Sequence, residues 1–148
     1  MSYSADQQAD ILELQQLLAR FAVGMTRMDI DAVLAVFTPD GYYSAFGEKY
    51  TLADFPALAQ AAPKGLFMTG MPQLDVTGDT GTGYQPLCFV DQSNHDMRLG
   101  WYTDTYLRTS DGWRLQTRTM TFLRRSGARD SGRAHDPLRP IPSGQADS

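Results

Sequence analysis

The sequence predicts a single α+β domain, with helices in its first half and an antiparallel sheet in its second half. Near the start, apolar residues recur at helical spacing, at Ile11, Leu14, Leu17, Leu18, Phe21 and Ala22. Later segments are rich in Thr, Val, Tyr, Phe and Trp and are bounded by turn residues. No helical pattern separates these segments, so the strands should pair antiparallel in a strongly twisted sheet. The length of 148 residues suits one compact domain.

Two helices are predicted to open the chain. The first spans residues 7–24, where one face is continuously apolar. The second begins at Asp29, whose side chain can accept hydrogen bonds from the free backbone amides that follow. The run from Phe37 to Gly41 is predicted to stop this helix, because Pro39 disfavours helical backbone at the residue before it.

A short strand and a third helix are predicted next. The aromatic stretch 42–46 favours a strand that ends at Gly47. Thr51 opens the third helix, with Asp54 three residues later as in a capping box, and the helix should end before Pro63. Four long strands follow, over residues 66–77, 84–91, 97–108 and 113–124.

The chain after the last strand has a different composition. Residues 126–148 contain almost no apolar side chains, so they are predicted to form a flexible tail beyond a domain that spans residues 1–125. As an alternative, residues 138–142 lie across a partner subunit or across the open end of the domain. His135 lies in this tail and is therefore a poor catalytic candidate.

Composition excludes several functional classes. With 13 Lys+Arg against 17 Asp+Glu and no basic stripe, the chain predicts no nucleic-acid partner. A single cysteine, Cys88, excludes an internal disulfide, and two histidines leave little for a metal site, so neither a metal nor a cofactor is expected. No apolar stretch approaches the roughly 18–20 residues of a membrane span, and the first residues lack the basic start of a signal peptide. We therefore expect no membrane partner and a cytoplasmic location.

The order of short motifs carries a family resemblance over residues 7–125. The pieces are Arg20-Phe21-Ala22, Asp29-Ile30-Asp31-Ala32, Phe37-Thr38-Pro39-Asp40, Gly78-Asp79, and Gly100 to Arg108 followed by Asp111-Gly112-Trp113-Arg114. Together they resemble the SnoaL-like branch of the nuclear transport factor 2-like (NTF2-like) superfamily. The resemblance implies a cystatin-like, cone-shaped α+β barrel, in which three N-terminal helices pack in a strongly bent antiparallel sheet. It also implies an apolar pocket at the wide end of the cone.

The resembled family implies site positions that this chain fills differently. Its dehydratase-type members place a Tyr on the first helix, a catalytic Asp five residues later and a His on the first long strand. The matching positions here are Phe21, Thr26 and Phe67. A further family acid falls near Val90 or Asp91. The resemblance therefore implies an apolar ligand-binding set instead of the acid–base set, namely Phe21, Met25, Thr26, Phe67, Val90, Met120 and Phe122. The simpler alternative is that these side chains fill the cone.

Four polar residues are weak catalytic candidates, namely Tyr42, Asp91, His95 and Asp104. Strand parity sends Tyr42 and Tyr43 to opposite faces, so one phenol can reach the pocket. Asp104 lies opposite an arginine such as Arg118. These charges form either a cross-strand ladder on the outer face, which is the favoured interpretation, or a pocket acid with a guanidinium partner. Asp91 and His95 form either an acid–base pair or part of a solvated hairpin connection.

Taken together, the sequence predicts a protein with a pocket for a small apolar molecule. By its resemblance to SnoaL-like cyclases, isomerases and dehydratases, it acts on or binds a polycyclic, steroid- or polyketide-like molecule. If it is an enzyme, it is a cofactor-independent isomerase, cyclase or lyase. The alternatives are a non-catalytic carrier or sensor, and a dimeric assembly module; a homodimer is expected.

Overall fold

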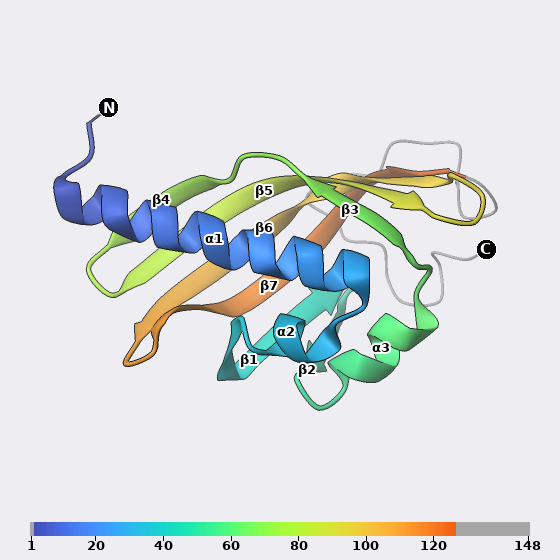
Figure 1. The fold of residues 1–148 in the computed structure, drawn as a ribbon, viewed down its shortest axis with the longest axis horizontal. Helices are drawn as coiled ribbons and strands as arrows, with labels where there is room; N and C mark the ends of the chain where they lie inside the picture. Colours follow the sequence, from blue (N-terminus) through green and yellow to red (C-terminus); the bar gives the residue numbers. More distant parts are fainter. Residues whose placement is uncertain (1, 127–148) are drawn as a thin grey trace.

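A strongly curved sheet carries one long helix along its concave side (Figure 1). The computed structural model describes residues 2–126. The elements are α1 (Ala5–Arg27), α2 (Ile30–Leu34), β1 (Phe37–Ala45), β2 (Glu48–Thr51), α3 (Phe55–Ala61), β3 (Gly65–Thr69), β4 (Gln73–Thr77), β5 (Thr80–Asp91), β6 (Met97–Thr109) and β7 (Gly112–Arg125). The predicted α+β class is confirmed. The tail from 127 to 148, with His135, lies outside the described residues.

Helix α1 is longer than predicted because both of its ends are capped. Ser4 Oγ accepts a hydrogen bond from Gln7 N at 3.1 Å, and Gln7 Oε1 accepts one from Ser4 N at 3.0 Å, which completes a capping box. At the other end Met28 adopts left-handed backbone with φ 56°. The predicted apolar face is buried against the sheet, as Leu14, Leu18 and Phe21 show.

The start of α2 agrees with the sequence, whereas the segments that follow it do not. Asp29 Oδ1 accepts from Ala32 N at 3.2 Å, as the predicted N-cap requires. The predicted end of the helix is confirmed, because α2 ends at Leu34, but residues 37–41 belong to β1, which was not predicted to start there. The register of β1 shifts between Phe37 and Tyr42. An edge or bulged strand tolerates a proline such as Pro39. Strand β2 was not predicted.

Two further boundaries differ from the prediction. Helix α3 begins at Phe55 and not at Thr51, whose hydroxyl donates to Asp54 Oδ2 at 3.0 Å and caps no backbone amide. The single strand predicted over 66–77 is two strands, β3 and β4, which pair with different parts of β5. Pro72 lies in the break and has no backbone N–H to donate to a ladder.

The sheet is mixed and open. Its order is β2-β1-β7-β6-β5-β3, with β4 also paired to β5. The predicted antiparallel pairing holds from β3 to β7, but β1 runs parallel to β7. This correction follows from the long connection between β1 and β7, which allows a parallel pair. The sheet does not close into a barrel. Strands β1 and β2 also precede α3, so the helices do not all come before the sheet.

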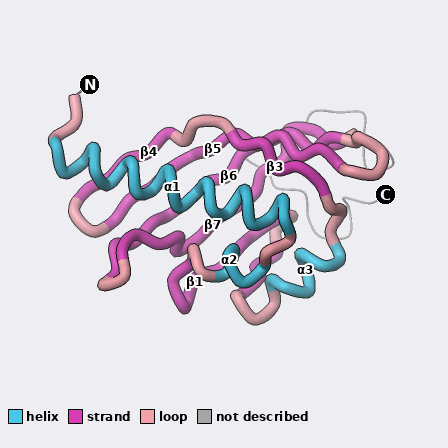
Figure 2. Tube along the Cα trace, viewed as in Figure 1, coloured by secondary structure: helices cyan, strands magenta, loops and turns pink. Residues whose placement is uncertain are grey.

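The two ends of the sheet differ in what covers them. The turns β4–β5 and β6–β7 lie at the same end as the start of α1, which we call the closed end (Figures 1 and 2). At the opposite, open end lie α3, β3 and the loop between β5 and β6.

Among the described residues, no helix is long and apolar enough to cross a membrane.

Candidate functional site

A cavity of about 100 Å³ lies at the open end, between α1, α3 and the concave face of the sheet. Most of its lining is aromatic or aliphatic. Its polar lining side chains are the phenols of Tyr43, Tyr50 and Tyr102 and the guanidinium of Arg98. The full lining comprises Phe21, Met25, Tyr43, Ala45, Phe46, Tyr50, Phe55, Leu58, Ala59, Ala62, Pro63, Phe67, Leu87, Phe89, Arg98, Tyr102, Met120 and Phe122. Within this set there is no carboxylate and no imidazole.

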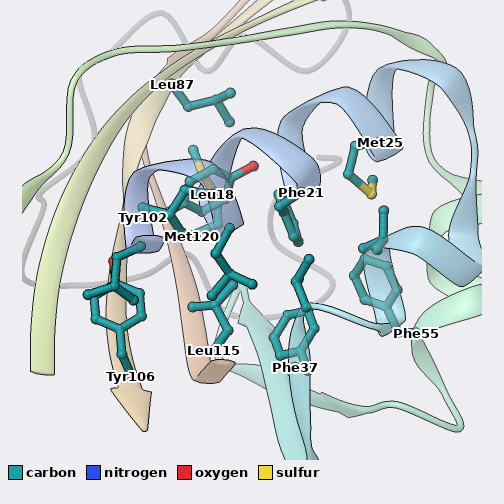
Figure 3. Close-up of a cluster of buried hydrophobic side chains, with 14 of the residues drawn as sticks. Leu18, Phe21, Met25, Phe37, Phe55, Leu87, Tyr102, Tyr106, Leu115 and Met120 are labelled. Atoms are coloured by element: carbon teal, nitrogen blue, oxygen red, sulfur yellow. The ribbon is translucent and has the colours of Figure 1, made fainter. Parts of the chain in front are cut away.

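Aromatic contacts hold the walls of the cavity. Figure 3 shows the rings of Phe21, Phe37 and Phe55 together between α1 and the sheet. Phe21 meets Phe37 edge-on, with ring centroids 6.1 Å apart, and Tyr43 meets Phe55 at 5.4 Å. Edge-to-face pairs of this kind are favourable beyond the area they bury. The walls are therefore defined by packing between α1, β1 and α3.

Behind the cavity, the strand register lines up a polar row across the concave face. Asp104 of β6 pairs with Arg118 of β7, Arg118 pairs with Tyr43 of β1, and Tyr43 pairs with Tyr50 of β2. Arg118 Nε and Nη2 donate to the two carboxylate oxygens of Asp104 at 2.8 Å each. Both side chains are fully buried. The favoured expectation of an outer-face ladder is therefore wrong, because the even-numbered residues of β6 face inward.

The buried pair is part of a larger hydrogen-bonded cluster. Tyr106 donates through its hydroxyl to Asp104 Oδ2 at 2.8 Å, and Arg118 Nη2 donates to Gln85 Oε1 at 2.9 Å. Gly83 makes room for this, because a Cβ there would lie 2.8 Å from the Tyr106 hydroxyl. Arg118 Nη1 has no hydrogen-bond partner among the described residues. We call Asp104, Arg118, Gln85 and Tyr106 the polar cluster.

Arg118 connects the polar cluster to the cavity floor. Its guanidinium carbon lies 3.8 Å from the ring centroid of Tyr102 and 4.5 Å from that of Phe21. Both rings line the cavity. A buried cation over aromatic faces is favourable, so Arg118 fixes the two rings from behind.

The phenols of the cavity are neutral hydrogen-bond donors. Burial raises the pKa of Tyr43 and of Tyr102, although the nearby Arg118 charge opposes the rise in each case. Burial, with the hydrogen bond to Glu48, also raises the pKa of Tyr50. Burial lowers the pKa of Arg118, but the charge of Asp104 and its hydrogen bond, together with Tyr102 and Tyr106, raise it by more, so the net pKa is raised and Arg118 stays cationic. The Tyr50 hydroxyl already donates to Glu48 Oε2 at 2.8 Å, so Tyr43 and Tyr102 are the neutral phenols that can donate a hydrogen bond within the described lining.

Five of the seven predicted ligand-binding residues line the cavity, namely Phe21, Met25, Phe67, Met120 and Phe122. Val90 does not, because Phe89 is the inward-facing residue of that strand and Val90 points to the other face. Thr26 does not line it either. Its hydroxyl donates to Ala22 O at 2.8 Å and accepts from Phe67 N at 3.0 Å. The binding role of all seven stays a prediction.

The predicted catalytic candidates do not gather in the cavity. Tyr42 does not line the cavity, and Lys49 Nζ lies 4.0 Å from its ring centroid. The neighbouring Tyr43 is the phenol that lines the cavity. Asp91 accepts from Ser93 N at 2.8 Å and from Ser93 Oγ at 2.7 Å, and these bonds lower its pKa. His95 is exposed in the same connection, which is the solvated hairpin alternative. Asp104 lies behind the floor, in the polar cluster.

Sequence reasoning missed several lining residues that it could have found. Arg98 has the same parity as Tyr102 and Asp104, so strand alternation groups it with them on one face, which the structure shows to be the concave face. Likewise Leu87 and Phe89 share the inward parity of Gln85. The contribution of α3, through Phe55, Leu58 and Ala59, had no comparable signal because it depends on tertiary packing.

A long helix in a curved sheet, with an apolar cavity at the open end, defines the NTF2-like class of proteins with a cystatin-like fold. The chain belongs to the SnoaL-like domain family, whose model matches residues 6–119. A curated relative is the uncharacterized protein Rv2910c of Mycobacterium tuberculosis. It is 31% identical over 132 residues, which cover 76% of this chain and 85% of that protein.

Two solved structures from Novosphingobium aromaticivorans share the fold. One is an NTF2-like protein with a cystatin-like fold, with a TM-score of 0.71 at 23% identity, covering 78% of this chain and 83% of the other. The second is a candidate scytalone dehydratase, with a TM-score of 0.73 at 10% identity, covering 93% of this chain and 95% of the other. At these identities the likeness concerns the fold and not the reaction.

Proposed function

We propose that this protein binds a compact apolar molecule in the cavity at its open end and offers it phenolic hydrogen-bond donors. The observation that carries the proposal is the cavity lining, which is apolar except for Tyr43, Tyr50, Tyr102 and Arg98. An apolar pocket with a few convergent polar groups is the usual form of a small-molecule site. Met25 and Met120 add deformable surface, which suits an irregular apolar guest.

The size of the cavity favours a molecule with a single ring. Its volume of about 100 Å³ is close to that of an engineered cavity of about 150 Å³ that takes benzene. Pockets for drug-sized ligands are larger, at about 300–1,000 Å³. A polycyclic ligand therefore requires α3 to move outward, whereas a single ring fits between the present walls.

Binding without turnover is supported better than catalysis. General-base chemistry needs a group that accepts a proton near neutral pH, and the described lining contains neither a carboxylate nor an imidazole. The catalytic candidate is a cofactor-independent isomerase, cyclase or dehydratase in which Tyr43 donates to a developing oxyanion. It is favoured by the position of Tyr43 beside Arg118 in the strand register. The scytalone dehydratase likeness supports it through the fold alone.

A matched pair of alanine variants tests the binding site. Ala62 lines the cavity and Ala61, the next residue, is exposed, so Ala62→Leu fills the cavity while Ala61→Leu does not. Thermal unfolding is measured with single-ring, steroid, polyketide-like and fatty-acyl compounds. We expect single-ring compounds to raise the Tm of wild type and of Ala61→Leu, and to have at least about tenfold weaker affinity for Ala62→Leu.

The outcomes separate the candidates. If no compound raises the Tm, or if Ala62→Leu binds as tightly as Ala61→Leu, the proposed site is wrong. Product analysis of the same mixtures tests catalysis: a product formed by wild type and lost in Tyr43→Phe establishes the enzyme, whereas binding without product establishes the carrier. The homodimer expected from the sequence stays a prediction, and sedimentation of the full chain measures it.

A further inference from the structure

Two phenols that line the cavity have hydroxyls without a hydrogen-bond partner. They belong to Tyr43 of β1 and Tyr102 of β6, and Tyr102 is 1% exposed. Neither hydroxyl takes part in a hydrogen bond within the part of the chain that the structure describes, and neither is sealed in the core as Thr38 Oγ1 is. A buried polar group without a partner is costly, because it has given up its bonds to water. Both hydroxyls are therefore open to a partner that enters the cavity.

The neighbouring phenols of the concave face are already engaged. The Tyr50 hydroxyl donates to Glu48 Oε2 at 2.8 Å, and the Tyr106 hydroxyl donates to Asp104 Oδ2 at 2.8 Å. In both cases the chain supplies a carboxylate as the acceptor. For Tyr43 and Tyr102 it supplies none among the described residues, although burial makes an acceptor more valuable there. This contrast indicates an acceptor that comes with the ligand.

Arg118 lies between the two open phenols in the sheet. It is the cross-strand neighbour of Tyr43, and its guanidinium carbon lies 3.8 Å from the ring centroid of Tyr102. In each phenol the Arg118 charge opposes the rise in pKa that burial causes, and it outweighs the contrary effect of Asp104. A nearby cation favours negative charge on a phenol oxygen, so it makes the hydroxyl a stronger donor. Both hydroxyls are thus prepared to donate to an oxygen that is rich in electrons.

We propose that the ligand of this cavity is a single-ring ketone, whose carbonyl oxygen accepts one hydrogen bond from Tyr102 and a second from Tyr43. This inference rests on the proposed function and adds the chemical class of the ligand. A carbonyl oxygen has two lone pairs and no proton of its own, so it matches two donors. The ring of the ligand packs against the apolar lining around Phe21 and Phe67.

Calorimetry with two compounds of one shape tests the inference. Acetophenone carries a C=O group where α-methylstyrene carries C=CH₂. We expect wild type to bind acetophenone at least about tenfold more tightly than α-methylstyrene. Tyr102→Phe and Tyr43→Phe should each weaken acetophenone about threefold and leave α-methylstyrene unchanged, so that the double variant loses the preference. Tyr84→Phe, which removes an exposed hydroxyl from β5, is the matched control and should change neither affinity.

Two further measurements separate recognition from folding. The infrared carbonyl stretch of bound acetophenone should lie at lower frequency in wild type than in either single variant, because donated hydrogen bonds weaken the C=O bond. The Tm of the variants without ligand should equal that of wild type, since neither hydroxyl bonds to another described residue. A carbonyl stretch that is the same in wild type and in both single variants overturns the assignment to these phenols.

The affinities decide the rest. Equal affinity of wild type for acetophenone and α-methylstyrene overturns the carbonyl preference but leaves the proposed apolar site standing. A full preference for acetophenone in Tyr102→Phe, lost only in Tyr43→Phe, overturns the part assigned to Tyr102. If neither compound binds to wild type while other single-ring compounds raise its Tm, the ligand class is wrong. If no single-ring compound binds at all, the proposed function fails as well.

Discussion

The closed and open ends of the concave face are built from the same strands but are filled in opposite ways. Towards the closed end, the polar cluster places a buried carboxylate and a buried guanidinium in direct contact, with Gln85 and Tyr106 around them. Towards the open end, the same strands supply rings and methionines around a cavity. Strand alternation alone does not distinguish the two ends, because Asp104 and Tyr102 have the same parity. The residue type at each inward position therefore decides whether that part of the concave face carries charged or apolar side chains.

This difference separates stability from binding. Removing one partner of a buried ion pair leaves an uncompensated charge, so the closed end should be sensitive to substitution. A cavity lacks the contacts that a filled core has, so its lining should tolerate volume changes better. Arg118 touches both regions, through Asp104 on one side and the rings of Tyr102 and Phe21 on the other. The floor of the cavity is thus held in place by the polar cluster.

The largest expected effect comes from breaking the polar cluster. Asp104→Ala removes the acceptor of two Arg118 bonds and of the Tyr106 hydroxyl bond, and leaves the guanidinium buried without its counterion. We expect a loss of about 3–5 kcal/mol in the free energy of unfolding, measured by urea denaturation. Asp104→Asn keeps the shape and one acceptor, so it should lose less.

The control is Asp75→Ala, which removes an exposed carboxylate from β4. It should change the free energy of unfolding by no more than about 0.5 kcal/mol. A loss below about 1 kcal/mol in Asp104→Ala would show that the ion pair contributes little, and the two ends would then not differ in the way described.

The sequence predicts the parts of the molecule that depend on local chemistry. The α1 stripe, the Asp29 cap and the extents of β6 and β7 follow from periodicity, capping and turn residues, whereas β5 begins at Thr80 and not at the predicted residue 84. Segments that depend on a distant partner were predicted wrongly. Pro39 predicts that no helix continues through its segment, but the parallel pairing with β7, which makes this segment part of β1, has no local signal.

The sequence likewise predicts some residues of the candidate site and misplaces others. Phe21 and Phe67 reach the cavity as expected, whereas Val90 misses it by one residue, which in a strand exchanges the two faces. The favoured prediction for Asp104 and Arg118 is a cross-strand ladder on the outer face, because opposite charges on neighbouring strands form such pairs. The two charges neutralise each other only because β6 and β7 pair, and the sequence of neither strand shows this by itself. At the open end, the contact between α1 and β3 is a neutral hydrogen bond, from Phe67 N to Thr26 Oγ1.

The second prediction concerns that neutral bond, between α1 and the edge strand β3. Thr26→Val keeps the shape of the side chain but removes the acceptor for Phe67 N, which otherwise bonds to Thr26 Oγ1 at 3.0 Å. We expect a loss of about 1–2 kcal/mol in the free energy of unfolding, because one backbone donor is left unsatisfied. Hydrogen exchange at the Phe67 amide should become faster. Thr82→Val, on an exposed position of β5, is the matched control and should change neither quantity. Unchanged exchange at Phe67 would contradict the bond.

The smallest expected effect lies at the surface of the closed end. Asp10 of α1 accepts two bonds from Arg108, at 2.9 and 2.8 Å, and one from Trp113 Nε1 at 3.0 Å. The hydrogen bond from Arg108 holds the pKa of Asp10 below its usual value of 3.8, against the opposing effect of burial. The ionised carboxylate therefore stabilises the fold at neutral pH. That contribution is lost as the pH falls through the lowered pKa of the folded state.

Asp10→Asn keeps the shape and an acceptor for Trp113 but removes the charge, so it isolates the pairing with Arg108. Urea denaturation between pH 3 and pH 7 should show wild type more stable than the variant at pH 7, with the difference shrinking below about pH 4. The effect should be smaller than that of Thr26→Val, because the Arg108 side chain is 39% exposed and water and salt screen the pair. Asp6→Asn, in the first turn of the same helix, controls for the interaction of a carboxylate with the helix dipole. A difference that stays constant from pH 7 to pH 3 would mean that Asp10 acts through its shape and not its charge. Of the Asp10–Arg108 and Asp104–Arg118 pairs, the buried pair would then be the one that stabilises the closed end through its charges.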